Sequence, residues 1–283
     1  MNHLTRCSGF TLIELSIVLV IIGLIVGGIL VGQDLIKAAE VRAQISQIEK
    51  YNQAVNTFRA KFNAIPGDMA VSTAQQFGFT LGSSCAGIQL GNRDGNGLID
   101  GYIAPWQLLQ GAGETHMFWV DLSSAVAGNL IEGQFPNSGA VLTGCGSITA
   151  LTTTPGTTFI GDYFPQAKIG HGTFVYVYET SGYNWYGVAA ITNVATSGVP
   201  TSGTTIPVMQ SYNIDKKVDD GLPATGAVQA AYINGNITTV QSAPNAASDT
   251  TTTCYNTTSN TYSLSTYANY GAGGNCALSF RFQ

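Results

Sequence analysis

Hydrophobic positions fall into two regimes along the 283-residue chain. Residues 10–32 (FTLIELSIVLVIIGLIVGGILVG) form an almost uninterrupted apolar run with one charged residue, Glu14. As a helix, which rises about 1.5 Å per residue, this run is long enough to span a bilayer. The polar segment 1–9 abuts it directly, and no small-residue cleavage site follows it, whereas a secretory signal peptide would have one. An ordinary signal anchor is the alternative interpretation.

Beyond the apolar run, hydrophobic residues recur at steps of three and four, which predicts that the helix continues. This stripe consists of Val41, Ile45, Ile48, Tyr51 or Asn52, Val55, Phe58 and Phe62, with Gln44, Gln47, Lys50, Gln53, Asn56 and Arg59 on the other faces. The sequence Ile-Pro-Gly-Asp at 65–68 then ends the helix. We expect one helix from Phe10 to about residue 62, about 80 Å long, whose second half packs under a globular domain. Two helices broken at Gly32 are the alternative.

From residue 70 the pattern changes to short segments separated by Gly, Pro, Asn and Ser. A helical stretch is expected around 117–122, running toward Ile131, and strands at 173–179, 185–191, 206–210 and 278–282. The prediction is an α+β protein: a long N-terminal helix, membrane-spanning in its first half, packed on a mainly antiparallel β domain with loop insertions. The expected regions are a leader (1–9), an assembly half of the helix (10–32), its amphipathic half (33–65) and a β-rich ectodomain (66–283).

The composition and the absence of known motifs argue against several classes of function. Only 10% of residues are charged and the net charge is −5, against roughly 25% charged residues in ordinary soluble domains. No basic stripe follows residue 70, so nucleic acid is not a predicted partner. No H-E-x-x-H, G-x-S-x-G or phosphate-binding glycine loop is present, so we predict no enzyme. A membrane-tethered extracellular enzyme stays open, with a carboxylate pair drawn from Asp94, Asp100, Glu114, Asp121, Glu132 and Glu179.

The chain has five cysteines: Cys7, Cys85, Cys145, Cys254 and Cys276. Cys7 lies in the leader and leaves with it if the leader is removed, and the other four allow three connectivities. We favour Cys85–Cys145 and Cys254–Cys276, because each closes the shorter available loop. Disulfides place the domain outside the cytoplasm.

Glu14 is an ionisable residue inside the apolar run, and such residues usually mark a function. Cleavage after Gly9 would free the amine of Phe10, which lies four residues before Glu14 and therefore on the same helix face. Glu14 can then neutralise that amine in its own chain or in a neighbour. In a filament, pairing with a neighbour would set the axial register.

The string GFTLIE at residues 9–14 resembles the processing site of type IV pilins and of the pseudopilins of type II secretion. The resemblance implies that a prepilin peptidase cuts after Gly9 and methylates the amine of Phe10, and that Glu14 serves assembly. Many pilins have a proline where this chain has Val31, and pseudopilins often lack it too.

What the resemblance implies is a structural filament subunit of a type IV pilus (a fimbrium) or of a secretion pseudopilus. Its partners would be prepilin peptidase, other pilin or pseudopilin subunits and the bacterial inner membrane, before assembly into a periplasmic or extracellular filament. The size and the many loops of residues 66–283 favour a minor or specialised subunit. The choice between pilus and pseudopilus stays open, and a calcium-dependent carbohydrate-binding adhesin is a further alternative.

The segment 92–101 (NRDGNGLIDG) is similar to a calcium-binding EF-hand loop. The predicted ligands are Asn92, Asp94 and Asn96 at positions one, three and five, the Leu98 carbonyl, and Asp100 at position nine. The final bidentate Glu is missing, since Ile103 takes its place, so a site must borrow a ligand, for instance Glu114. Some pseudopilins bind calcium in their β domains, so the resemblance also favours calcium as a cofactor. A Gly/Asn-rich turn without metal is the alternative.

Two further segments of the sequence are candidate functional regions. The charged stretch 215–223 predicts a solvated helix-to-turn connection, with a subunit contact or a second calcium site as alternatives. The segment 255–275 lies between Cys254 and Cys276, and the resemblance makes it a candidate recognition loop. Its Tyr255, Tyr262, Tyr267 and Tyr270 either stack on sugars or pack the loop on its own sheet, and we favour packing.

Overall fold

The computed structural model describes residues 11–79, 93–99, 113–135, 151–152, 160–194, 200–235 and 240–282. Contacts divide the chain into two compact units, 1–40 and 41–283. The helices are α1 (Leu12–Phe62), α2 (Val71–Phe77), α3 (Glu114–Ser123) and α5 (Val208–Val218), with 3-10 segments η1 (Ile160–Asp162) and η2 (Thr266–Gly271). The strands are β1 (Leu151–Thr152), β2 (Phe174–Thr180), β3 (Tyr183–Val194), β4 (Pro200–Gly203), β5 (Val228–Gln229), β6 (Ala231–Tyr232), β7 (Gln241–Ser242), β8 (Asn245–Ala246), β9 (Tyr255–Asn256), β10 (Thr261–Tyr262) and β11 (Leu278–Arg281).

Helix α1 is a single element of 51 residues, which confirms the predicted long helix and excludes a break at Gly32. Its first turn is a capping box, in which Glu14 Oε2 accepts hydrogen bonds from Thr11 N (2.8 Å) and Thr11 Oγ1 (2.7 Å). The amide of Glu14 donates back to Thr11 Oγ1 at 3.3 Å. This reciprocal arrangement satisfies backbone donors that a helix start otherwise leaves unpaired.

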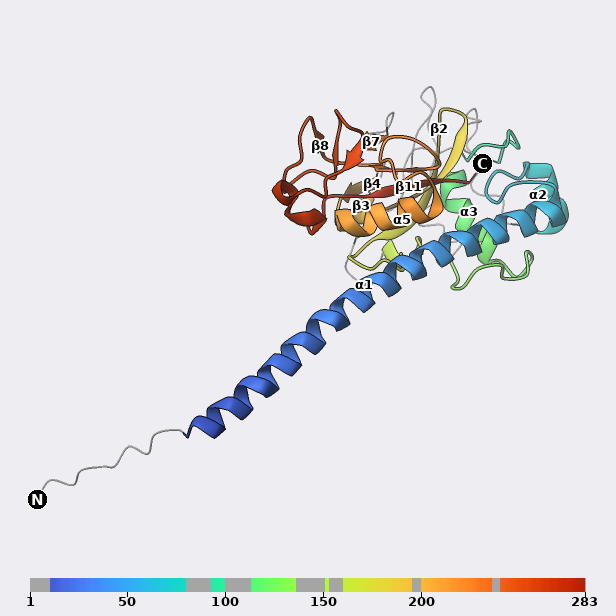
Figure 1. Cartoon of the computed structure of the whole chain (residues 1–283). Coiled ribbons are helices and arrows are strands. Elements are labelled where there is room, and N and C mark those ends of the chain that lie inside the picture. The colour runs from blue at the N-terminus through green and yellow to red at the C-terminus, as the bar shows by residue number, and fades with distance from the viewer. Residues whose placement is uncertain are drawn as a thin grey trace, which may run out of the picture. The chain divides into compact units, whose positions relative to one another are not determined.

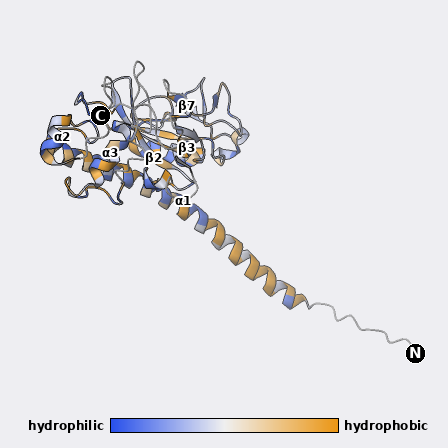
Figure 2. Cartoon of the chain, turned by 180° about the vertical axis from the view of Figure 1, so that it is seen from behind, coloured by the Kyte–Doolittle hydropathy of each residue, from blue (hydrophilic) through white to orange (hydrophobic). Residues whose placement is uncertain are grey.

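The first unit contains the apolar part of α1, which is hydrophobic almost throughout (Figure 2). Its large apolar side chains from Leu12 to Ile36 are between 50% and 88% exposed. The helix is long and apolar enough to cross a membrane. An exposed apolar surface of this length is typical of a helix that a bilayer or other helices cover.

In the second unit, α1 buries one face from Val41 to Phe62 against the β domain. The predicted stripe is confirmed at Val41, Ile48, Tyr51, Val55, Phe58 and Phe62, but the assignment of Gln44 and Gln47 to outer faces is wrong. Gln47 accepts a bond from Lys168 N (2.9 Å) and donates to Gln166 O, and Gln44 accepts from Ile169 N (3.0 Å). The glutamines are buried because they satisfy backbone groups of 166–169 that α1 covers.

The β domain is organised around β3, the 12-residue central strand of an antiparallel six-stranded sheet. Strand β2 pairs with β3 along Phe174–Thr180, and β11 pairs with its other edge through Leu278–Arg281. Strands β1 and β4 flank the far end of β3, and β5 continues the sheet beyond β11. The strands predicted at 173–179, 185–191 and 278–282 therefore form the centre of the sheet.

The strand predicted at 206–210 is wrong. Ile206 makes one bridge to Cys276, and α5 begins at Val208. Pro207 precedes the first turn, a position at which its missing amide costs nothing. Val208, Ser211 and Ile214 are buried at three-residue spacing, so a short apolar run that resembles a strand forms a helix face instead.

Helix α3 is buried in all ten of its residues. It confirms the helix expected around 117–122, but it ends at Ser123 rather than running to Ile131. In Figure 1 the C-terminal part of α1 runs beside α3. Trp119 of α3 contacts Tyr51 of α1 and Tyr186 of β3, with ring centroids 5.1 and 6.5 Å apart. This aromatic cluster joins helix, helix and sheet in one core.

Candidate functional site

The proposed processing site at Gly9 and Phe10 lies outside the described residues. Glu14 lies in the first turn of α1, with its carboxylate turned back on Thr11. The structure therefore gives Glu14 a local role, as the acceptor of the capping box, that the sequence analysis missed. The signal was the spacing of Thr11 and Glu14, which is that of a capping box.

Four glycines interrupt the apolar part of α1, namely Gly23, Gly27, Gly28 and Gly32. A Cβ added at any of them would meet no heavy atom of the chain within 4 Å. Packing within this chain therefore does not require glycine at these positions. Spacing of this kind permits close approach of a second helix in a membrane.

The loop 93–99 holds three of the predicted calcium ligands, Asp94, Asn96 and Leu98, whereas Asn92 and Asp100 lie outside the described residues. Asp94 Oδ1 accepts the amide of Asn96 at 2.9 Å, and Asn96 Oδ1 accepts the amide of Leu98 at 2.6 Å. These are successive Asx turns, in which short polar side chains cap their own backbone. Side-chain oxygens two residues apart therefore curl the loop.

Asp68 is the residue of this site that the sequence analysis missed. It follows the end of α1 and is almost fully buried. Its Oδ1 accepts the amides of Gly95 (2.8 Å) and Asn96 (3.1 Å), and its Oδ2 accepts the amide of Gly97 (2.8 Å). Three successive amides that converge on one carboxylate form an anion nest. No local pattern connects residue 68 to this loop, so its role could be found only in three dimensions.

Asp68, Asp94 and Glu114 together form an acidic cluster whose carboxylate oxygens lie within 4.8 Å of one another. Glu114 is fully buried at the start of α3 and accepts the amide of Asp94 at 3.1 Å. The three residues come from the α1–α2 connection, the loop and α3. Oxygen ligands in such a cluster have the chemistry that a hard divalent cation requires.

Burial raises the pKa of Asp68 to about 7, and the negative charge of Asp94 adds to that rise. The unfolded chain releases this proton near its ordinary pKa of 3.8, whereas the folded chain keeps it to about pH 7. Folding therefore takes up a proton between these values, and the contribution of Asp68 to stability falls as pH rises through that window. A bound cation would lower this pKa, because its charge offsets both the burial of the Asp68 carboxylate and the repulsion by Asp94.

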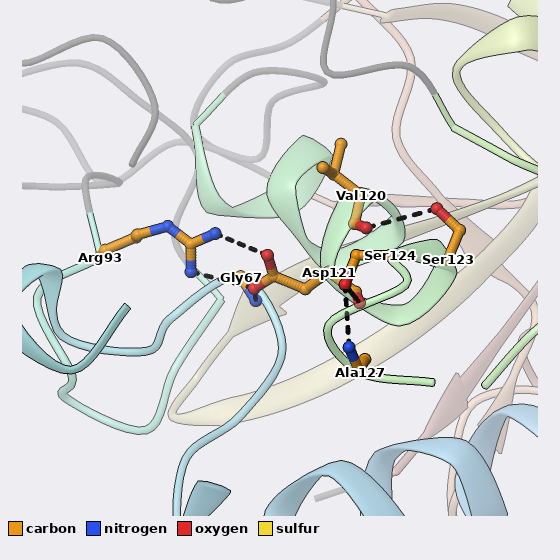
Figure 3. Close-up of polar contacts among 7 residues, drawn as sticks. All are labelled: Gly67, Arg93, Val120, Asp121, Ser123, Ser124 and Ala127. Carbon is orange, nitrogen blue, oxygen red and sulfur yellow. Dashed lines mark hydrogen bonds and ion pairs between the residues drawn. The ribbon is translucent and has the colours of Figure 1, made fainter. Parts of the chain in front are cut away.

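A buried ion pair anchors the same loop to α3 (Figure 3). Arg93 donates from Nη2 to Asp121 Oδ1 at 2.6 Å and from Nη1 to Oδ2 at 2.9 Å, and both side chains are 1% exposed. Asp121 Oδ2 also accepts the amide of Gly67 at 2.8 Å. Burial raises the pKa of Asp121, and the Arg93 charge and the Gly67 amide oppose that rise. With the Gly67 amide, the pair joins the α1–α2 connection, the loop and α3.

Gly67 and Asn184 complete the support of the loop. Gly67 has φ +86°, and a Cβ there would lie 2.4 Å from Glu114 O, so only glycine permits this approach to α3. Asn184 of β3 is fully buried, accepts the amide of Ile99 at 2.8 Å and donates to Gly97 O at 3.0 Å. The loop is therefore held from the sheet side as well as from the helix side.

The charged stretch 215–223 forms the end of α5 and the turn after it, which confirms the predicted helix-to-turn connection, but Asp215 is buried rather than solvated. Asp215 accepts bonds from Tyr262 Oη (2.8 Å) and Gly221 N (3.1 Å), and burial raises its pKa to about 6. The carboxylates of Asp215, Asp219 and Asp220 lie within 4.8 Å of one another. Asp219 accepts the amides of Ala227 and Val228, so part of this acidic character serves the turn itself.

The family comparison matches one region of the chain. Residues 4–30 match the prokaryotic N-terminal methylation motif. No curated protein and no solved structure gave a match to the chain. The matched region covers residues 4–9 of the polar N-terminal segment, which include Gly9, then Phe10, Glu14 and most of the exposed apolar part of α1. The chain thus combines a pilin-like α+β architecture with the N-terminal methylation motif that is the hallmark of type IV pilins and pseudopilins.

Proposed function

We propose that this chain is a structural subunit of a type IV pilus-like or type II secretion pseudopilus filament. Prepilin peptidase cleaves it after Gly9 and methylates Phe10. The mature chain is anchored in the bacterial inner membrane. It then assembles through α1 with other pilin or pseudopilin subunits into a periplasmic or extracellular filament.

One observation carries this proposal: the methylation motif runs into the apolar part of α1, whose large side chains from Leu12 to Ile36 are exposed within this chain. A helix of that kind needs a bilayer before assembly and other apolar helices after it. The motif favours a structural protein over an enzyme. The large, loop-rich second unit supports a minor or specialised subunit, because loops are where binding functions concentrate.

The processing step is tested by replacing Gly9 with valine. Co-expressed with a prepilin peptidase, the parent chain is expected to lose residues 1–9 and to carry a methyl group on Phe10, and both changes are read by intact-mass and peptide mass spectrometry. Gly9→Val is expected to keep its leader, at least about 90% unprocessed, because a β-branched side chain beside the scissile bond crowds its approach to the peptidase.

Gly32→Val is the matched control, since Gly32 lies outside the matched motif and its surroundings leave room for a side chain. It is expected to be processed like the parent. A parent chain that is left uncut, or a Gly9→Val chain cut at the same bond, would contradict the proposed processing.

We propose in addition that the acidic cluster of Asp68, Asp94 and Glu114 binds calcium, in keeping with the adhesin alternative. Together with these carboxylates, the predicted ligands of the loop are Asn92, Asn96, the Leu98 carbonyl and Asp100. The observation that favours it is the close approach of three carboxylates to a loop that resembles an EF-hand. Glu114 would replace the missing final Glu.

Calcium is expected to raise the melting temperature of the full chain at pH 8, where Asp68 is ionised. With about 10 mM calcium and a dissociation constant of about 0.1 mM, binding stabilises the folded state by about 2.7 kcal/mol. For a domain of this size that corresponds to a rise of about 5 °C or more. Asp94→Ala is expected to lose most of the rise, measured by differential scanning calorimetry in detergent.

Asp162→Ala is the control, because Asp162 is an exposed aspartate in η1 outside both acidic clusters. Its calcium response should equal that of the parent. The calcium proposal is wrong if the parent shows no rise, or if Asp94→Ala shows the full one.

A further inference from the structure

The disulfide-closed segment near the C terminus presents two of its four tyrosines to solvent. The bridge Cys254–Cys276 is formed, with a Cα–Cα distance of 5.0 Å. Tyr255 and Tyr262 are 6% and 4% exposed, which confirms for these two the predicted packing of the segment on its own domain. The packing prediction is wrong for Tyr267 and Tyr270, which are 81% and 64% exposed.

The backbone that carries these two rings is held in a sparsely populated conformation. Asn269 and Tyr270, both in η2, have φ of 50° and 52°, and a bulky residue seldom adopts this left-handed region. Tyr270 N donates to Ser265 O at 3.0 Å and Ala272 N to Asn269 O at 3.1 Å, which fixes the turn. Non-glycine residues kept in such conformations concentrate at functional sites.

The start of helix α5 packs against the turn that carries the two rings. Gly271 has φ +73°, and a Cβ there would lie 3.0 Å from Met209 N and 2.6 Å from Leu264 Cδ2. The turn therefore rests directly on the start of α5. Two exposed aromatic rings on a turn pinned by a disulfide and by a helix lose little conformational freedom when a ligand binds.

The C-terminal stretch of sequence that carries the rings is polar but almost uncharged. In the sequence from 240 to 282 the charged residues are Asp249 and Arg281. Asp249 accepts bonds from Asn256 Nδ2 and Ser265 N, so its carboxylate holds the disulfide-closed segment. The exposed neighbours of the rings in η2 are Thr266 and Asn269, which offer a hydroxyl and an amide.

We propose that Tyr267 and Tyr270 form a binding surface for a neutral polysaccharide. Aromatic faces are electron-rich and stack against the C–H faces of sugar rings, and hydroxyl and amide groups bond the sugar hydroxyls. Nucleic acid or an anionic lipid surface would require a cluster of Lys and Arg, which the sequence from 240 to 282 lacks. This surface is independent of assembly through α1, so it adds a ligand to the proposed filament subunit.

The test uses the full, unassembled chain in a polyoxyethylene detergent, so that its outcome does not depend on filaments and no sugar head group competes. The probes are cellulose, chitin and starch as neutral polysaccharides, with pectate as an anionic one. The parent is expected to bind at least one neutral probe. Tyr267→Ala and the double Tyr267→Ala/Tyr270→Ala variant are expected to bind it more weakly, the double variant by about tenfold or more.

Two controls separate ring chemistry from folding. Tyr267→Phe/Tyr270→Phe keeps both rings and should retain most of the binding. Tyr183→Ala removes a 47% exposed tyrosine on β3, packed against Arg281, and should bind like the parent. Because Tyr267 is 81% exposed, its replacement should leave the thermal transition unchanged.

Three results would overturn the proposal: no neutral probe retains the parent, the double alanine variant binds as well as the parent, or pectate alone retains the chain. If the alanine variants instead lose self-association in sedimentation velocity while no probe binds, the surface is a contact between copies of this chain and the polysaccharide proposal is wrong.

Discussion

Replacing Arg93 with alanine is expected to lower the free energy of unfolding of the second unit by about 3–5 kcal/mol. The reason is that Asp121 would remain buried, 1% exposed, with its charge uncompensated. For a domain of this size the melting temperature should fall by about 10 °C. Chemical denaturation of the full chain in detergent, followed by tryptophan fluorescence, measures the effect.

Two variants show whether burial of the charge is the cause. Lys50→Ala breaks a second ion pair, between Lys50 and Glu132, in which the two side chains are 66% and 85% exposed. It should lower the free energy of unfolding by less than about 1 kcal/mol. Arg93→Met/Asp121→Leu removes both charges and should cost less than Arg93→Ala, although the Gly67 amide then loses its acceptor. Equal losses for Arg93→Ala and Lys50→Ala would show that the Arg93–Asp121 pair does not stabilise the fold as argued.

Replacing Glu14 with glutamine is expected to prevent filament assembly while the helix and the processing step persist. Glutamine can still accept the bonds from Thr11 in the capping box, as glutamate does. It cannot neutralise the Phe10 amine that cleavage would create. An unpaired charge in the apolar core costs about 2.5–3.5 kcal/mol per subunit, or about fiftyfold or more in each association step. Filaments sheared from cells and counted by electron microscopy report the loss.

Thr11→Ala is the matched control, because it removes the hydroxyl of the capping box and keeps the Glu14 carboxylate. It should assemble, whereas Glu14→Ala should fail like Glu14→Gln. If Glu14→Gln is processed and assembles normally, the register role of Glu14 is wrong. If Thr11→Ala loses filaments to the same extent as Glu14→Gln, the capping box rather than the charge governs assembly.

The central strands were predictable because their apolar residues are contiguous and β-rich, as in β2 and the middle of β3. The same rule failed at 206–210, where a short apolar run is compatible with either a strand or a helix face. The segment is a helix whose buried side includes Ser211 and Ile214. That burial depends on what packs against the segment, which the local sequence does not show.

The candidate site shows a similar division. The oxygen-bearing loop could be seen from the spacing of Asp94 and Asn96, because Asx turns are local. Its central acceptor, Asp68, and its anchor, Asp121, lie more than 25 residues away from their partners in the loop. A carboxylate whose hydrogen-bond partners lie this far away in the sequence cannot be recognised from the residues next to it.

By itself the sequence determined the N-terminal part of this protein: the methylation motif, the apolar helix and its continuation to Phe62. Those signals are continuous or repeat every three to four residues, so each is complete within a few helical turns. Only the tertiary structure decided that Gln44 and Gln47 face the core, that Arg93 neutralises Asp121, and that Tyr267 and Tyr270 are exposed while Tyr255 and Tyr262 are buried. Each of these depends on which distant backbone or side chain covers the residue, and burial by distant segments leaves no periodic trace in the chain.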